Sequence, residues 1–189
     1  MGMRPKFLIQ ISFVFIISLG HLASAQIVQR SNNWAVMIKS ANLMNLFKVS
    51  DDIYRSEQPD KDDFLELSRI GIKSVLNLRT TKTDDEAIGK LPIKPYLVAM
   101  NAGSVSDKDI IAALKIIKSA PKPMLIHCRH GSDRTGVVVA MYRIVFQGWS
   151  KEAALDELLH GGFGFHEYYK NIPEYIKNVN IDAIKNGLK

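Results

Sequence analysis

The feature that most constrains the fold is the stretch around the only cysteine in the 189 residues. Residues 125–136 read Leu-Ile-His-Cys-Arg-His-Gly-Ser-Asp-Arg-Thr-Gly. The short apolar segment Met124–Ile126 predicts a buried strand that ends at the cysteine. The run 137–146 is apolar on nearly every side, which predicts a helix in the centre of a domain. The stretch therefore predicts a strand, a tight loop and a buried helix.

The residue types in this loop favour a reactive anion-binding site. A loop that closes onto a helix N-terminus points backbone N–H groups inward, and its positive potential stabilises a thiolate at Cys128. Arg134 offers a planar fork for two phosphate oxygens. A thiolate against a bound phosphate is a nucleophile for phosphoryl transfer. We also expect Gly131 to keep side chains off the anion, and Thr135 to donate its hydroxyl to the sulfur.

The pattern His127-Cys128-x5-Arg134-Thr135-Gly136 resembles the signature of cysteine-dependent protein tyrosine and dual-specificity phosphatases. Residues 54–59, Tyr-Arg-Ser-Glu-Gln-Pro, resemble the opening of atypical dual-specificity phosphatases of bacteria, fungi and plants. Residues 142–166 resemble the tail of bacterial exported (periplasmic) members of the family. The alternative for the cysteine is a buried structural thiol.

The resemblance implies a set of site residues. The expected catalytic residues are Cys128, Arg134, Thr135 and His127, with Asp133 as the candidate general acid and Asp107 as the second candidate. The expected phosphate-binding residues are Arg129, His130, Gly131, Ser132, Asp133 and Arg134. We expect no cofactor and no metal, since the sequence shows no ligand cluster.

The general acid is the uncertain part of this assignment. Members of the family place an aspartate on a loop after the strand that we predict at Ile93–Met100, and Gly103 stands there in this chain. Asp107 opens a predicted helix, where aspartate is more often a cap. Asp133 resembles an aspartate that some phosphoinositide and lipid phosphatases carry before the loop arginine. His166, after a glycine-rich stretch, is either a substrate contact or a packing residue.

The function that these residues imply is hydrolysis of phosphate monoesters on phosphotyrosine or phosphoserine/threonine proteins, through a phosphocysteine intermediate. A phosphoinositide or inositol polyphosphate phosphatase is the alternative, as is a weakly active phosphate-binding module or a rhodanese-type sulfurtransferase. The net charge of +6 suits an anionic substrate. No dense basic stripe with interleaved aromatic residues points to nucleic acid.

The N-terminus predicts export. Residues 1–25 have the order of a secretory signal peptide: Arg4 and Lys6, then the apolar run 7–19, then Ala23-Ser24-Ala25. Cleavage would leave Gln26 as the first residue of a periplasmic or secreted chain. An uncleaved leader would be the only membrane contact, although its apolar run is short for a bilayer.

The remaining pattern predicts an α/β fold, and the resemblance implies that this fold is like that of protein tyrosine phosphatases. Residues 26–44 read as a lead-in with a short helix, and 45–189 as the catalytic domain. Strand and helix patterns alternate along this domain, which predicts a central, mostly parallel sheet of about four to five strands flanked by helices. Such sheets bind ligands at the carboxyl ends of their strands, where the cysteine loop lies.

Overall fold

The computed structural model describes residues 1–2, 30–40 and 42–189, and its core is one six-stranded sheet in the order β1-β2-β3-β6-β4-β5. The strands are β1 (Val36–Met37), β2 (Phe47–Lys48), β3 (Ile53–Ser56), β4 (Ser74–Asn77), β5 (Lys94–Leu97) and β6 (Met124–His127). Strands β3, β6, β4 and β5 are parallel, whereas β1 and β2 form an antiparallel edge. The predicted fold class is confirmed, with a sheet of six strands.

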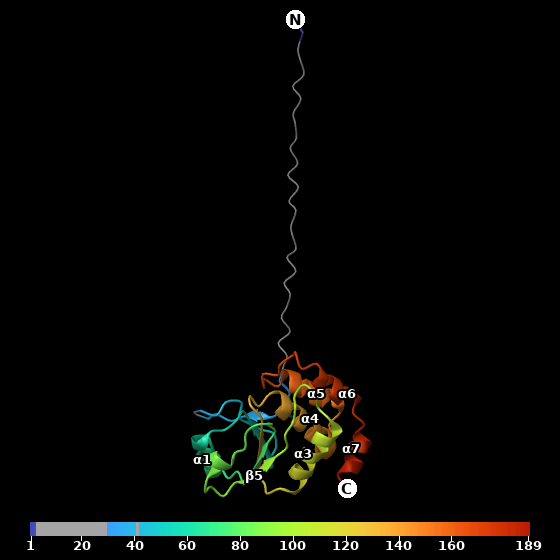
Figure 1. The fold of residues 1–189 in the computed structure, drawn as a ribbon. Coiled ribbons are helices and arrows are strands. Elements are labelled where there is room, and N and C mark those ends of the chain that lie inside the picture. The colour runs from blue at the N-terminus through green and yellow to red at the C-terminus, as the bar shows by residue number, and fades with distance from the viewer. Residues whose placement is uncertain (3–29, 41) are drawn as a thin grey trace.

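Helices cover both faces of this sheet (Figure 1). They are α1 (Lys61–Arg69), α2 (Asp85–Ile88), α3 (Asp107–Ser119), α4 (Asp133–Gln147), α5 (Lys151–His160), α6 (Asn171–Asn178) and α7 (Ile181–Gly187). One face of the sheet packs on α3–α7 through residues such as Leu76 and Ile126. The other face packs on α1 and α2 through Val75 and Leu125. This alternation is the two-residue period of a strand buried on both sides.

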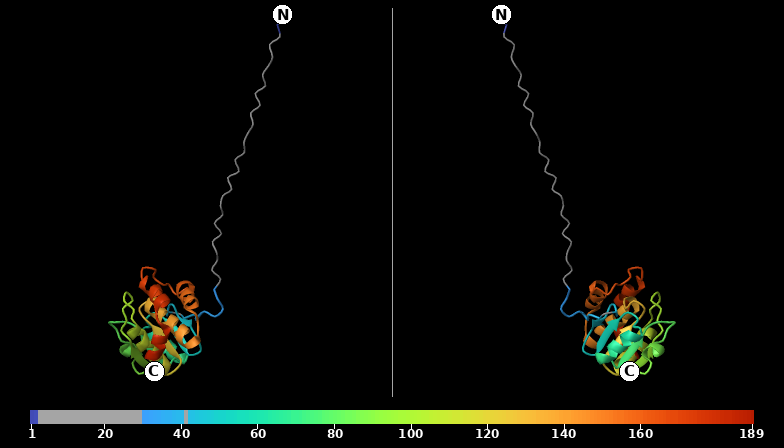
Figure 2. Two further views of the ribbon diagram at one scale, coloured as in Figure 1. Left: turned by 90° about the vertical axis from the view of Figure 1, so that its right-hand side faces the viewer. Right: turned by 90° about the vertical axis from the view of Figure 1, so that its left-hand side faces the viewer.

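Helix α4 is buried along most of its length because it lies between the sheet and the C-terminal helices, which Figure 2 shows gathered together in orange and red. The predicted helix without a polar face is thus confirmed. The buried Arg143 of this helix pairs with Glu157 of α5 through Nη2–Oε1 and Nε–Oε2 contacts of 2.7 and 2.9 Å. Burial of both charges is tolerable because each is hydrogen-bonded to the other.

Backbone groups of Asn33, Ala35 and Val49 form hydrogen bonds with this ion pair. The backbone N–H of Ala35 donates to Glu157 Oε1 at 2.6 Å, and Arg143 donates to the carbonyl oxygens of Asn33 and Val49. Trp34 is buried beside them. The short helix predicted in the lead-in is wrong: the pairing partner β2 draws these residues into strand β1. The predicted leader and Gln26 lie outside the described residues, apart from Met1 and Gly2. Within the described part of the chain, no helix has the length and apolar character needed to cross a membrane.

Strands β3, β6 and β4 each end in a polar residue, and these three residues lie side by side across the sheet. Ser56 of β3 and Asn77 of β4 are both in register with His127 of β6. All three residues are fully or almost fully buried. Cys128 follows directly, so the cysteine loop starts at the centre of the sheet, at the edge where parallel sheets bind ligands.

Candidate active site

The loop between β6 and α4 has the form of an anion cradle. Cys128 is a free, buried cysteine at its start. The backbone N–H groups of residues 129–132 donate to no acceptor among the described residues, and α4 begins directly after them. Backbone donors without an acceptor in the protein are free to bind a ligand or water. Here they precede a helix N-terminus, and together these features make a site for an anion.

Arg134 lies in the first turn of α4 and is held from the side of the sheet. Its Nη1 donates to the carbonyl oxygens of Leu78 and Met100, at 3.3 and 3.5 Å. These carbonyls follow β4 and β5, so two neighbouring strands orient the guanidinium. Both anchoring bonds use Nη1, which leaves Nη2 and Nε to bind two oxygens of a phosphate.

His127 positions the loop. The residue is fully buried, its Nε2 lies 3.0 Å from Asp84 Oδ2, and its Nδ1 lies 3.1 Å from the carbonyl oxygen of Cys128. Both ring nitrogens therefore face acceptors, and the ring fixes the peptide that carries the cysteine. This geometry gives His127, predicted as catalytic, the position of a residue that acts through Cys128.

Asp84 is a site residue that sequence reasoning missed. It directly precedes α2, and it accepts hydrogen bonds from His127, Gln58 and Asn77. Burial by itself raises the pKa of Asp84, but the hydrogen bond and charge of His127, with the bonds from Gln58 and Asn77, outweigh burial and lower the pKa below 3.8. Asp84 is thus an ionised anchor beneath the loop.

This lowered pKa predicts how stability depends on pH. A carboxyl whose folded pKa is below its unfolded pKa stabilises the fold above the unfolded value and loses that contribution as the pH falls through the folded value. We expect Asp84→Asn to cost about 1–3 kcal/mol at pH 7, and the difference from the wild type to shrink below pH 3.8. Urea denaturation between pH 7 and pH 3 measures this. The exposed Asp62→Asn is the control, and a difference that stays constant with pH contradicts the prediction.

Arg55 is a second residue whose role sequence reasoning did not assign. This side chain of β3 is almost fully buried, its Nη2 donates to the Gly131 carbonyl at 2.7 Å, and its guanidinium lies 3.6 Å from the Phe163 ring centroid. Burial lowers the pKa of Arg55 to about 10, while the charges of Glu157 and Cys128 raise it. Arg55 therefore remains a cation at neutral pH and favours the thiolate.

Gly131 uses the backbone freedom that glycine was expected to give this loop. Its φ is +73°, and a Cβ there would lie 2.4 Å from the backbone oxygen of Ser56. The structure thus adds a second reason for glycine, which is the close approach of the loop to the end of β3. Any side chain would push the loop off the strand that supports it.

The two hydroxyls of the loop have different surroundings. Thr135 is fully buried, and its hydroxyl has no hydrogen-bond partner among the described residues, so the predicted bond to the Cys128 sulfur is absent. The Ser132 hydroxyl donates to the carbonyl of Phe163 at 2.7 Å, so the group of Ser132 that could bind a phosphate is its backbone N–H. The hydroxyl therefore ties the loop to the glycine-rich stretch.

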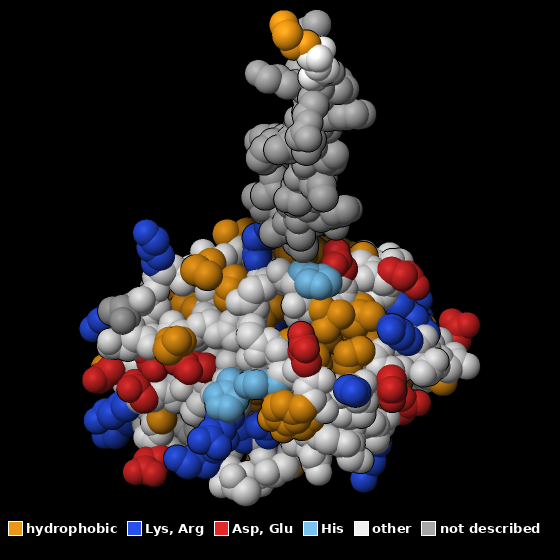
Figure 3. Space-filling model, turned by 90° about the horizontal axis from the view of Figure 1, so that it is seen from above, with side chains coloured by type: hydrophobic (Ala, Val, Ile, Leu, Met, Phe, Trp, Pro, Cys, Tyr) orange, Lys and Arg blue, Asp and Glu red, His pale blue; other side chains and the backbone are white. Residues whose placement is uncertain are grey.

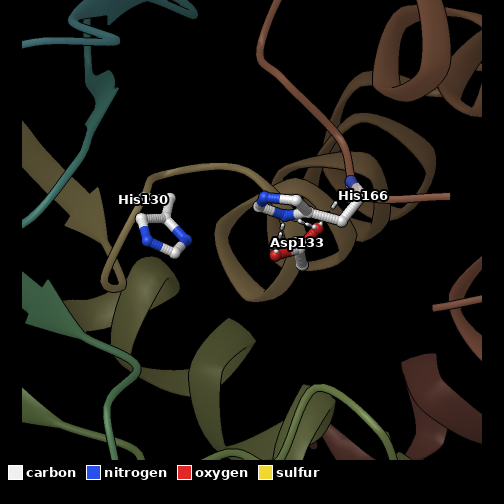
Figure 4. Close-up of side chains that lie close together, drawn as sticks. All are labelled: His130, Asp133 and His166. Carbon is white, nitrogen blue, oxygen red and sulfur yellow. Dashed lines mark hydrogen bonds and ion pairs between the residues drawn. The ribbon is translucent and has the colours of Figure 1, made fainter. Parts of the chain in front are cut away.

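Asp133 is buried and points toward His166 (Figure 4). Its Oδ1 accepts the backbone N–H of His166 at 3.0 Å, and the His166 Nδ1 lies 2.9 Å from Oδ2. The ring of His130 is 5.4 Å from that of His166, centroid to centroid. Figure 3 shows histidines beside Lys and Arg side chains on one face of the molecule. Sequence inspection missed this group because His166 lies 33 residues after Asp133.

The other acid candidate, Asp107, has a different environment. Its Oδ1 accepts the Tyr175 hydroxyl at 2.7 Å, which links α3 to α6. Burial and then this hydrogen bond raise the pKa of Tyr175. The predicted capping role of Asp107 is wrong: Ser106 caps α3 because its side chain, one residue earlier, accepts from Asp109 N. At Gly103 the backbone N–H donates to Asn101 Oδ1.

The site therefore combines a buried cysteine, unpaired backbone donors and an oriented guanidinium. Such an arrangement can hold a tetrahedral dianion against a sulfur nucleophile. Asp133 and His166 form a hydrogen-bonded pair at its rim. The Asp107 carboxylate is instead hydrogen-bonded to the Tyr175 hydroxyl.

Comparison with known proteins places this geometry in context. A sequence model described as "Tyrosine phosphatase family" matches residues 41–188. The dual specificity protein phosphatase TpbA of Pseudomonas aeruginosa is 35% identical over 159 residues, which cover 82% of this chain and 71% of the relative. A crystal structure of TpbA matches with a TM-score of 0.76 and 32% identity, covering 84% of this chain and 98% of that one.

A second relative is named for a different substrate class. The inositol diphosphatase SIW14 of Saccharomyces cerevisiae is 30% identical over 151 residues, which cover 75% of this chain and 53% of the relative. The crystal structure of its core catalytic domain has a TM-score of 0.67 at 28% identity and covers 80% of this chain and 92% of that one. Both structures have the sheet and helix arrangement described above.

Proposed function

The chain belongs to the tyrosine phosphatase family, and from this premise we propose that it hydrolyses phosphate monoesters of proteins by transfer of the phosphoryl group to Cys128. The observation that carries the proposal is the row of unpaired N–H groups at residues 129–132, set between Cys128 and the guanidinium of Arg134. This cradle matches the three non-bridging oxygens of a phosphate ester.

The reaction has two balanced steps. The Cys128 thiolate attacks phosphorus, the S–P bond forms, and the P–O bond to the substrate breaks as the leaving oxygen takes a proton. Water then attacks the phosphocysteine, releases inorganic phosphate and restores the thiolate, and its proton returns to the group that gave one. Arg134 and the loop N–H groups stabilise the equatorial oxygens in both steps.

We assign the proton to the pair of Asp133 and His166, because Gly103 has no proton to give and Asp107 is bonded to Tyr175. A general acid contributes roughly 10²–10⁴-fold, and only where the leaving group is poor. We expect Asp133→Asn to slow alkyl phosphates by about that factor and activated aryl phosphates far less. The measurement is kcat/KM against the pKa of the leaving group.

Asp107→Asn is the matched control, since it changes the same functional group in a helix of the same domain. A steeper dependence on leaving-group pKa in Asp107→Asn, with an unchanged one in Asp133→Asn, would reverse the assignment.

The favoured substrate is a phosphotyrosine or phosphoserine/threonine protein, because the more similar relative is named a dual specificity protein phosphatase and one of its structures is described as a complex with pTyr. An inositol polyphosphate is the second candidate. The exposed Arg129 and His130 at the rim of the loop support it, as does the name of the yeast relative. A panel of phosphopeptides and inositol phosphates, assayed with the purified protein, separates the two by kcat/KM.

The proposed location of this activity is outside the cytoplasm. The order of charge, apolar run and Ala-Ser-Ala in residues 1–25 supports cleavage before Gln26. We expect N-terminal sequencing of the exported protein to start at Gln26. Recovery of the chain with Met1 retained in a soluble cytoplasmic fraction would contradict export.

A further inference from the structure

We propose that His130, Asp133 and His166 form a binding site for a divalent transition-metal ion of the zinc class, and that the bound ion reversibly inhibits the phosphatase. The binding part stands on the geometry alone. The inhibitory part rests on the proposed phosphatase function.

The three side chains already converge. Each offers one ligand atom, and these atoms all lie within 4.8 Å of one another (Figure 4). Zinc bonds to nitrogen and oxygen of about 2.0–2.2 Å place neighbouring ligand atoms roughly 3.3 Å apart in a tetrahedron. The 2.9 Å between His166 Nδ1 and Asp133 Oδ2 is close to that separation. Only His130 has to move, and its side chain is exposed.

Two of the three ligands are held in place by the fold. Asp133 is fixed in the first turn of α4, with 8% of its side chain exposed, and the backbone N–H of His166 also binds its carboxylate. His166 is itself held by that carboxylate, with 36% of its side chain exposed to solvent. The site is therefore partly organised before an ion arrives.

The donor set and its surroundings select the kind of ion. Two imidazoles and one carboxylate suit zinc and its neighbours, whereas magnesium and calcium prefer oxygen ligands. Arg134 follows Asp133 in the chain and Arg129 precedes His130, and both repel a cation. Only an ion that bonds strongly to imidazole can offset this repulsion.

Inhibition follows from what the ion replaces. The proposed function assigns the leaving-group proton to Asp133 and His166, and an ion bound between His166 Nδ1 and the Asp133 carboxylate would occupy the atoms that must carry it. The pair then cannot protonate a leaving oxygen. Turnover of alkyl phosphates should thus be inhibited more strongly than turnover of activated aryl phosphates.

The test separates this site from the thiolate, which is itself a zinc ligand. Zinc chloride is titrated by calorimetry into the full chain carrying Cys128→Ser, where no turnover is needed and sulfur is absent. We expect one ion per chain, with proton release, and no heat from magnesium. Adding His166→Gln or His130→Gln should weaken binding by roughly tenfold or more. The control is His160→Gln, which removes a histidine of another exposed pair, with Asp156, on α5.

In the enzyme with Cys128 intact, zinc should inhibit, EDTA should restore the rate, and His166→Gln should raise the inhibition constant by a similar factor. Zinc binding to Cys128→Ser that is absent, or that His166→Gln and His160→Gln weaken equally, would overturn the site. Binding without inhibition, or inhibition that His166→Gln leaves unchanged, would overturn the regulatory role. Failure of the enzyme to hydrolyse any phosphate ester would contradict the proposed function and leave the calorimetric result standing.

Discussion

Replacement of Cys128 by serine is expected to abolish turnover, by about 10⁴-fold or more in kcat, while phosphate esters still bind. A serine hydroxyl at this position is a far weaker nucleophile than a thiolate. The anion cradle is unaffected, because the N–H groups of residues 129–132 belong to the backbone and Arg134 is anchored to Leu78 and Met100. Single-turnover kinetics and equilibrium binding of a phosphotyrosine peptide measure the two effects.

Two further observations accompany this result. The phosphoenzyme trapped by acid quench from the wild type should be absent from Cys128→Ser. EDTA should not lower the activity of the wild type, since no step of the proposed reaction uses a metal ion. Full activity in Cys128→Ser, or activity that EDTA removes, would contradict the cysteine mechanism.

Replacement of Arg134 by alanine is expected to remove binding as well as rate, with a loss on the order of 10³-fold or more in kcat/KM. The guanidinium both holds the substrate and stabilises the charge that spreads over the equatorial oxygens. Arg134→Lys should not restore activity, since a single ammonium group cannot reach the two strand carbonyls and a phosphate at once. Phosphate affinity in a Cys128→Ser background measures the binding component alone.

The matched control for Arg134 is Lys108→Ala, which removes an exposed positive charge from the first turn of α3. If long-range charge alone explained the effect of Arg134, the two variants would weaken phosphate binding similarly. A loss confined to Arg134 supports direct contact, whereas retention of affinity in Arg134→Lys would contradict the need for a planar fork.

Much of the fold and the core of the site could be predicted from local sequence. Met124–Ile126, Cys128 and the buried helix after them lie next to one another in the chain, so their pattern is visible without tertiary information. The N-cap of α3 was harder to predict from sequence. Asp107 and Ser106 are neighbours with similar capping preference, and only the backbone geometry decides between them.

The supporting residues could not be predicted because they come from distant segments. Asp84 lies 43 positions from its partner His127, and Arg55 lies 76 positions from Gly131. Each looks like an ordinary surface charge until the strands pair and bury it. The same holds for His166, for which the sequence left both a substrate contact and a packing role open. Buried charges with several partners are the part of a site that depends most on tertiary packing.

The attachment of residues 33–35 to the ion pair of Arg143 and Glu157 makes these residues part of the folded domain. A shortened protein that starts at Asn45 would lose the Ala35 N–H that binds Glu157, the Asn33 carbonyl that binds Arg143, and the buried ring of Trp34. The buried charges of Arg143 and Glu157 would then be exposed to water on that side, although the catalytic loop would keep all of its residues. The boundary for expression work therefore falls before Asn33, upstream of the first residue that resembles the family.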